Sequence, residues 1–138
     1  MKRRVLKIGR WVIDVLFAVR YYDIAGVVAC LRDINSPRDV IDRSIEIMEE
    51  CEDDKGFTFA NPYLKRAVSV IGPSSSGEEF VNTLVHEIHH VAVAIASELG
   101  VDLEDETPAY LSGNAAMEFI DLICEFGCSK CHKKENRI

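Results

Sequence analysis

Hydrophobic and polar positions recur along the first half of the chain in patterns that predict one strand and two helices. Residues 11–19 are mostly β-branched or aromatic, which predicts a largely buried strand. A short helix is expected over residues 23–32, where Asp23 can cap its start. A second helix is expected to start at Ser36-Pro37 and to end by Gly56, with apolar residues at helical spacing on one face.

The second half of the chain predicts a strand hairpin followed by two helices. Residues 57–59 and 66–71 have strand composition and flank a turn at Asn61-Pro62. A largely apolar helix follows up to Leu99, and its capping box is either Ser75 with Glu78 or Ser76 with Glu79. A last helix starts at Thr107-Pro108 and ends near Gly127. This order predicts an α+β domain in which helices pack against a small, mainly antiparallel sheet.

Composition and charge narrow the class of protein. The 138 residues suffice for one domain, expected over residues 1–127 with a Cys- and Lys-rich tail at 128–138. A formal net charge of −7 argues against nucleic acid and anionic membranes as partners. The basic N-terminus followed by residues 11–19 resembles a signal peptide, but Asp14 interrupts the apolar run and no small-residue cleavage site follows. Five cysteines, an odd number, fit reduced thiols, so a cytoplasmic protein is expected.

The segment His86-Glu87-Ile88-His89-His90 contains the spacing HExxH. Residues four apart share one face of a helix, so His86 and His90 can bind one zinc ion per chain. Glu87 projects about 100° round the helix from His86, where it can act as general base on the water that zinc activates. The alternative is two polar surface histidines beside a glutamate, but the surrounding helix is largely apolar and burying unpartnered polar side chains is costly.

Spacing alone does not identify the third zinc ligand or the residues that support the histidine pair. His89 lies one turn from His86 and is interpreted as a surface or outer-shell residue, while Asn82 could orient His86 or be solvated. No histidine lies between His90 and His132, so the third ligand is expected among the acidic residues that follow the helix. Glu106 is favoured because it directly precedes the last helix; the other candidates are Asp102, Glu104 and Asp105.

These segments resemble small gluzincin-type zinc metallopeptidases, and more narrowly the short peptidases encoded by phages and prophages of gut bacteria. The resemblance spans roughly residues 11–126 and rests on four segments: Gly56–Phe59, Ala67–Pro73, Glu79–Glu87 and Glu106–Leu111. It implies His86 and His90 as zinc ligands, Glu87 as base and Glu106 as third ligand. One departure from larger gluzincins is Pro108, which places Glu106 at or before the helix start.

The resemblance also implies a strand beside the metal helix that binds peptide substrate. We expect this to be an edge strand whose backbone can pair with an extended peptide, or else a strand that only builds the sheet: Val68, Ser69, Val70 and Ile71. Tyr110 lies one turn after Glu106 and is a candidate oxyanion donor, with core packing as the alternative.

The cysteines divide into two groups. Cys30 and Cys51 lie on apolar helix faces and are expected in the core. Near the C-terminus, Cys128, Cys131 and His132 match a c-type haem attachment pattern, which the lack of an export signal disfavours. Together with Cys124 they could instead form a second zinc site, or remain free thiols.

Two functions follow as hypotheses. The first is a zinc-dependent metallopeptidase that hydrolyses peptide bonds, and the second is a non-catalytic zinc-containing binding or structural protein of phage or prophage origin. Glu87 favours the enzyme, because a structural zinc needs no base and tends to fill its fourth position with Cys or His.

Overall fold

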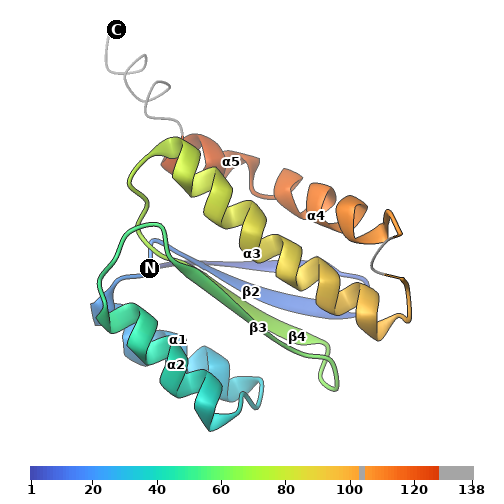
Figure 1. The fold of residues 1–138 in the computed structure, drawn as a ribbon, viewed down its shortest axis with the longest axis horizontal. Coiled ribbons are helices and arrows are strands. Elements are labelled where there is room, and N and C mark those ends of the chain that lie inside the picture. Colours follow the sequence, from blue (N-terminus) through green and yellow to red (C-terminus); the bar gives the residue numbers. More distant parts are fainter. Residues whose placement is uncertain (103–104, 128–138) are drawn as a thin grey trace, which may run out of the picture.

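Four strands form one mixed sheet, and helices cover both of its faces (Figure 1). The structure is a computed structural model, and it describes residues 1–102 and 105–127. Short 3-10 and π-helical turns lie at Tyr21–Asp23 and Ile123–Gly127. The strands and α-helices follow in chain order: β1 (Lys2–Ile8), β2 (Trp11–Phe17), α1 (Ile24–Asp33), α2 (Arg38–Glu49), β3 (Gly56–Asn61), β4 (Arg66–Ile71), α3 (Gly77–Glu98), α4 (Thr107–Met117) and α5 (Ile120–Leu122).

The predicted α+β class is confirmed, but the expectation of a mainly antiparallel sheet is wrong. The strand order is β1-β2-β4-β3, and the two central strands, β2 and β4, are parallel. The β3–β4 hairpin forms as predicted, and it is β4 that pairs with β2. The reason lies in side-chain polarity: Ala67, Val68, Val70 and Ile71 are all buried, and a strand that is apolar on both faces belongs in the middle of a covered sheet.

The two faces of the sheet each bury a separate apolar cluster. On one face α3, α4 and α5 cover the sheet, and on the other face α1 and α2 cover it (Figure 1). Alternation along β2 supplies both clusters, since Ile13, Val15 and Phe17 face α3 while Leu16 faces α1. The sheet therefore separates the two clusters, and the side chain of each residue in β3 and β4 lies either on the α3 side or on the α1–α2 side.

The first strand, β1, was not predicted. Its residues 2–4 are all basic, which hid an alternation that directs Lys2, Arg4 and Leu6 to the α3 side. Gly9, with φ +58°, and Arg10 form the two-residue turn that connects β1 to β2.

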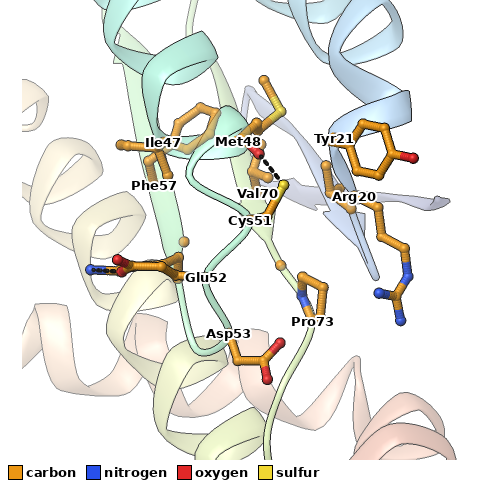
Figure 2. A pocket seen from close by; sticks show the side chains of 14 residues that line it. Arg20, Tyr21, Ile47, Met48, Cys51, Glu52, Asp53, Phe57, Val70 and Pro73 are labelled. Carbon is orange, nitrogen blue, oxygen red and sulfur yellow. Dashed lines mark hydrogen bonds and ion pairs between the residues drawn. The ribbon is translucent and has the colours of Figure 1, made fainter.

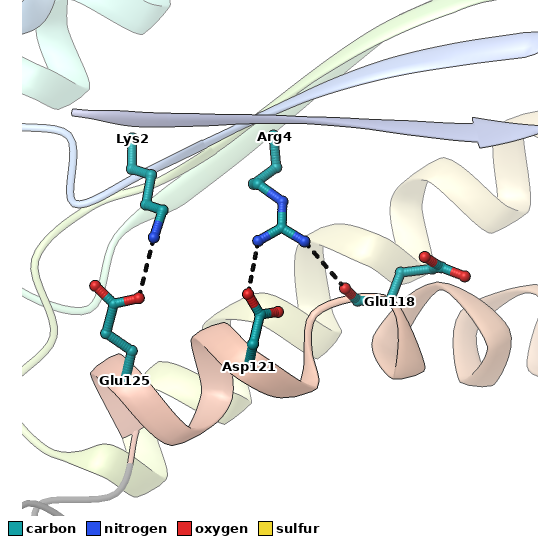
Figure 3. Close-up of polar contacts among 5 residues, drawn as sticks. All are labelled: Lys2, Arg4, Glu118, Asp121 and Glu125. Atoms are coloured by element: carbon teal, nitrogen blue, oxygen red, sulfur yellow. Dashed lines mark hydrogen bonds and ion pairs between the residues drawn. The ribbon is translucent and has the colours of Figure 1, made fainter.

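Two basic side chains of β1 bind the last helical segments. Lys2 Nζ contacts Glu125 Oε2 at 3.0 Å, and Arg4 contacts Asp121 Oδ2 at 2.8 Å and the Glu118 carbonyl oxygen at 3.5 Å (Figure 3). These contacts fasten the end of the last helical segment to the sheet edge.

On the opposite face, β2 buries one carboxylate. Asp14 is 2% exposed and accepts hydrogen bonds at Oδ1 from Arg3 Nε (3.0 Å) and Nη2 (2.8 Å). Its Oδ2 accepts from Arg66 Nη2 at 3.3 Å, so Asp14 connects β1, β2 and β4. The hydrogen bonds and the charge of Asp14 raise the pKa of Arg3 above its ordinary value.

Cys30 and Cys51, both predicted to lie on apolar helix faces, have different environments. Cys30 is half-buried against the α1–α2 cluster, where burial and, secondly, the charge of Asp14 raise the pKa of its thiol. Cys51 is exposed, so its predicted place in the core is wrong. The reason is that α2 ends at Glu49, and Cys51 has φ +54° in the turn that follows. No helix within the described ranges is long and apolar enough to cross a membrane.

We predict that Asp14→Asn lowers the free energy of unfolding by about 1.5–3 kcal/mol, because it weakens hydrogen bonds between charged groups at a buried position. The measurement is urea denaturation, with Asp42→Asn on the exposed face of α2 as the matched control, expected within about 0.5 kcal/mol of the parent. Equal stability of the two variants would contradict this role for Asp14.

Candidate metal centre

Helix α3 holds the candidate site, and Ser76, one of the two predicted capping residues, caps its start. The hydroxyl of Ser76 accepts a hydrogen bond from the Glu79 backbone N–H at 3.1 Å. Ser75 instead donates its hydroxyl to Asp54 Oδ2 at 2.6 Å, and this bond, with one from the Ser75 backbone N–H, lowers the pKa of Asp54. The apolar side of α3 packs on the sheet, and the helix axis is fixed across β2, β4 and β3.

The structure brings His86 and His90 together on the exposed side of α3. Their Nε2 atoms are 3.2 Å apart, and the ring planes make an angle of 81°. Two nitrogen ligands at 2.0–2.1 Å from one tetrahedral zinc ion would be about 3.3–3.4 Å apart. The separation of the pair, at which one ring can donate an Nε2–H hydrogen bond to the other, is thus close to the one that a shared zinc ion requires. His89 is exposed beside them, as expected for a residue that is not part of the pair.

Glu87 lies at the interface between α3 and the sheet, at the bottom of a hollow that His86 and His90 also line. It is 4% exposed, and its Oε1 accepts a hydrogen bond from Thr58 Oγ1 at 2.9 Å. Thr58 Oγ1 also lies 2.8 Å from Ser69 Oγ. A hydroxyl has one proton, so when Thr58 donates to Glu87, Ser69 must donate to Thr58. The result is a directed chain of hydrogen bonds from β4 through β3 to the carboxylate.

A glycine allows the start of β3 to approach this carboxylate. A Cβ atom on Gly56 would lie 2.8 Å from the Val70 carbonyl oxygen, and 3.0 Å and 3.1 Å from Cγ and Oε2 of Glu87. The contact with Val70 is closer than a side chain tolerates, and it is with backbone that cannot swing away, while the other two would force the Glu87 side chain to shift. Gly56 is therefore required where β3 passes the Glu87 side chain.

Two hollows meet at His86. The first has a volume of about 410 Å³ and lies between α3 and β3; its lining includes His86, Glu87 and His90 together with Gly56, Phe57, Thr58 and Ala60. The second, of about 590 Å³, lies between α3 and α4, and its lining includes Asn82, His86, His89, Asp105 and Ser112. His86 thus lines both hollows and His90 lines the first, while Glu87 forms part of the floor of the first hollow.

The candidate third ligand, Glu106, is not placed beside the histidines. It is exposed, and its carbonyl oxygen accepts the first hydrogen bond of α4, from the Tyr110 N–H at 3.0 Å. Asp105 lines the second hollow with His86, but its Oδ1 caps α4 by accepting from Thr107 N–H and Oγ1 at 2.9 and 2.8 Å. These bonds, the hydroxyl first, lower the pKa of Asp105 below its ordinary value.

The other two acidic candidates, Asp102 and Glu104, add no ligand beside the histidine pair. Asp102 is exposed, and Glu104 lies outside the described residues. Among residues 1–102 and 105–127, no group of three His, Cys, Asp or Glu side chains is close enough to hold a metal ion. The structure therefore assembles two of the predicted ligands and the predicted base.

The expectation that Val68, Ser69, Val70 and Ile71 form an edge strand is wrong. They belong to β4, which pairs with β2 on one side and with β3 on the other, so its backbone cannot pair with a further strand. The free edge next to the candidate site belongs to β3. Ser69 still contributes, but through its hydroxyl beneath Glu87.

Tyr110 and the C-terminal cysteines lie apart from the histidine pair. Tyr110 is 64% exposed on α4, which excludes core packing, and it lines neither hollow. Cys124 is an exposed free thiol. Cys128, Cys131 and His132, which could form a second zinc site with it, lie outside the described residues, as does the whole tail 128–138.

The sequence interpretation missed the partners of Glu87. Thr58 and Ser69 are polar residues in the middle of their strands, flanked by apolar residues, and they face each other across the β3–β4 ladder. A glutamate on the buried side of an apolar helix requires such partners. The sequence therefore contained a signal for these partners, namely a glutamate on the buried side of a helix together with two hydroxyl residues in the strands.

Comparison of the chain with models of known protein families, with curated proteins and with solved structures finds no match. The side chains described above are therefore the basis on which a function is proposed.

We predict that Thr58→Val destabilises the metal-free protein by about 1–3 kcal/mol, because it leaves a buried carboxylate without its donor. In a Glu87→Leu background the same substitution should cost much less, since no carboxylate is left unsatisfied. Urea denaturation of the four proteins of this double-mutant cycle measures the difference. An equal cost in both backgrounds would mean that Thr58 does not stabilise Glu87.

Proposed function

We propose that this protein is a zinc-dependent metallopeptidase. The observation that supports this most strongly is the combination of two imidazole Nε2 atoms at 3.2 Å with a buried glutamate one residue after the first histidine. Imidazole nitrogen is a preferred zinc ligand, and a catalytic zinc site keeps one position open. The hollow in front of the pair supplies the space for a substrate.

In this proposal His86 and His90 hold the metal through their Nε2 atoms. A bound zinc ion supplies Lewis acidity, which lowers the pKa of water and polarises a carbonyl group. Glu87 takes the proton of the attacking water and delivers it to the amine that leaves, so that the peptide bond is exchanged for a carboxylate and an amine. The Thr58 hydroxyl holds one carboxylate oxygen and leaves the other, Oε2, for this transfer.

The free edge of β3 is the proposed site for the substrate backbone. It has unpaired N–H and C=O groups that an extended peptide can bind as an added strand. Gly56, Phe57, Thr58 and Ala60 of this strand line the same hollow as His86 and Glu87. A peptide paired with β3 therefore runs past the histidine pair, which favours peptides over smaller amides.

For the third ligand we propose Glu106. Asp105 already uses its carboxylate to cap α4, whereas the side-chain carboxylate of Glu106 has no hydrogen bond or ion pair with another described residue. A rearrangement at the start of α4 is needed to bring Glu106 to the histidines. Asp105 is the alternative, because it already lines a hollow with His86.

The competing function is a zinc-containing binding protein without turnover. Such a protein gains nothing from Glu87, because burying a carboxylate costs free energy that the hydrogen bond from Thr58 only offsets. The retention of this group under the histidine pair favours the enzyme.

We predict that the full chain binds one zinc ion at this site. His86→Ala and His90→Ala should each weaken the zinc affinity at least about 100-fold, because even residues that only hydrogen-bond to a ligand change metal affinity about 10–100-fold. His89→Ala is the matched control on the same helix and should leave the affinity unchanged. Competition with a zinc-sensitive chelating dye measures the constants. The assay is run in a Cys128→Ser, Cys131→Ser background, and full affinity in both variants would refute the site.

We predict that Glu106→Gln weakens zinc binding more than about tenfold, because a carboxylate ligand is replaced by a neutral amide. Asp105→Asn should retain the affinity and only lower stability, because its carboxylate caps α4. Zinc affinity and thermal unfolding are measured for both. The reverse pattern would assign the ligand to Asp105.

We predict chelator-sensitive cleavage of a broad peptide library, reduced about 10²–10⁴-fold or more by Glu87→Gln. The amide has nearly the same shape and can still accept from Thr58, so zinc binding and folding should persist. Cleavage is quantified by mass spectrometry, and zinc content is measured on the same samples. Zinc-loaded parent protein that cleaves nothing would favour the binding protein, and cleavage that survives Glu87→Gln would exclude the proposed base.

A further inference from the structure

A separate cavity lies at the carboxyl ends of the two parallel strands. After β2 the chain turns to α1 on one face of the sheet, and after β4 it turns to α3 on the other face (Figure 1). Neighbouring parallel strands whose connections leave in opposite directions open a crevice at their carboxyl ends, and ligands of α/β proteins bind in such crevices. Here that crevice is bounded by residues 19–21 and 70–73 and by the turn after α2 (Figure 2).

The cavity is preformed and apolar inside. Backbone hydrogen bonds from Val19 to Ile71, from Gly72 to Lys55 and from Asp54 to Pro73, all 2.8–3.1 Å, join the segments around it. Its walls include Val19, Met48, Phe57, Val70 and Pro73.

The size of the cavity limits what it can hold. Its volume is about 110 Å³. An apolar cavity of about 150 Å³ holds a benzene molecule. This one therefore suits a branched or linear side chain of about four heavy atoms, and it is too small for an aromatic ring.

The mouth of the cavity carries two opposite charges that are free for a ligand. Lys55 and Glu52 form an ion pair at 3.3 Å and neutralise each other. Arg20 makes no ion pair with a described carboxylate, and Asp53 has neither a hydrogen bond nor an ion pair within the described part of the chain. In Figure 2 the Arg20 guanidinium and the Asp53 carboxylate lie on either side of Pro73.

We infer that this cavity binds a free aliphatic α-amino acid of the size of leucine, isoleucine or methionine. The aliphatic side chain fills the apolar interior. The carboxylate pairs with Arg20, and the ammonium group pairs with Asp53; both ligand groups are charged at pH 7. The inference does not depend on the proposed peptidase, because neither Arg20 nor Asp53 lines the hollow beside the histidine pair.

The test is isothermal titration of the full chain, without added metal, with L-leucine and four analogues. Leucine should bind saturably, with a dissociation constant of about 1 mM or below. Leucinamide lacks the carboxylate, 4-methylpentanoate lacks the ammonium group, glycine lacks the side chain, and phenylalanine exceeds the cavity. Leucinamide and 4-methylpentanoate should each bind at least about tenfold more weakly, the factor that corresponds to one lost charge-assisted contact. Glycine and phenylalanine should also each bind at least about tenfold more weakly, because glycine buries no apolar side chain and the ring of phenylalanine does not fit.

Variants assign the binding to this cavity. Arg20→Gln and Asp53→Asn should each weaken leucine binding at least about tenfold, and Arg38→Gln, an exposed arginine outside the cavity, should not. All three positions are exposed, and thermal unfolding confirms that the variants fold. The inference is overturned if leucine shows no saturable binding at about 10 mM, if an analogue binds equally well, or if Arg20→Gln and Asp53→Asn bind like the parent.

Discussion

The hydrogen bond between Thr58 and Glu87, 2.9 Å long, connects the helix α3 to the sheet at the point on which the candidate site depends. A buried carboxylate without a donor is costly, so this contact fixes the rotation of α3 about its axis. With Glu87 turned to the sheet, the 100° step between successive helix residues turns His86, and with it His90, to the exposed side above β3. The geometry of the histidine pair is thus a consequence of where Glu87 is buried.

The mixed sheet provides the partners for this arrangement. Because β4 is apolar on both faces it occupies the centre, and β3, with Phe57 and Phe59 on one face and Thr58 on the other, forms the edge. This order puts a hydroxyl under the helix and leaves a free backbone edge in front of the histidines. The same order makes β2 and β4 parallel neighbours, which creates the separate cavity at their carboxyl ends.

Local patterns predicted most of the elements, but not how the strands pair. Helical spacing and the Ser76 cap located α3, and strand composition gave β4 over the residues that form it. The edge position was assigned to β4 rather than β3, and β1 was missed because its basic residues outweighed its alternation. Strand pairing depends on contacts between residues far apart in the chain, which periodicity within one segment does not encode.

The candidate site was predicted to the extent that it lies within one helix. His86, Glu87 and His90 are placed by spacing alone, whereas Thr58, Ser69 and Gly56 come from other elements and follow only from the pairing of β3 with β4. For the same reason spacing does not place the third ligand, which we propose at the start of α4. Anomalous diffraction at the zinc absorption edge, from crystals of the full chain grown with zinc, tests the central claim most directly. The account predicts a zinc peak about 2.0–2.1 Å from Nε2 of both His86 and His90. Crystals in which zinc is bound only elsewhere, with both histidines free of metal, would contradict it.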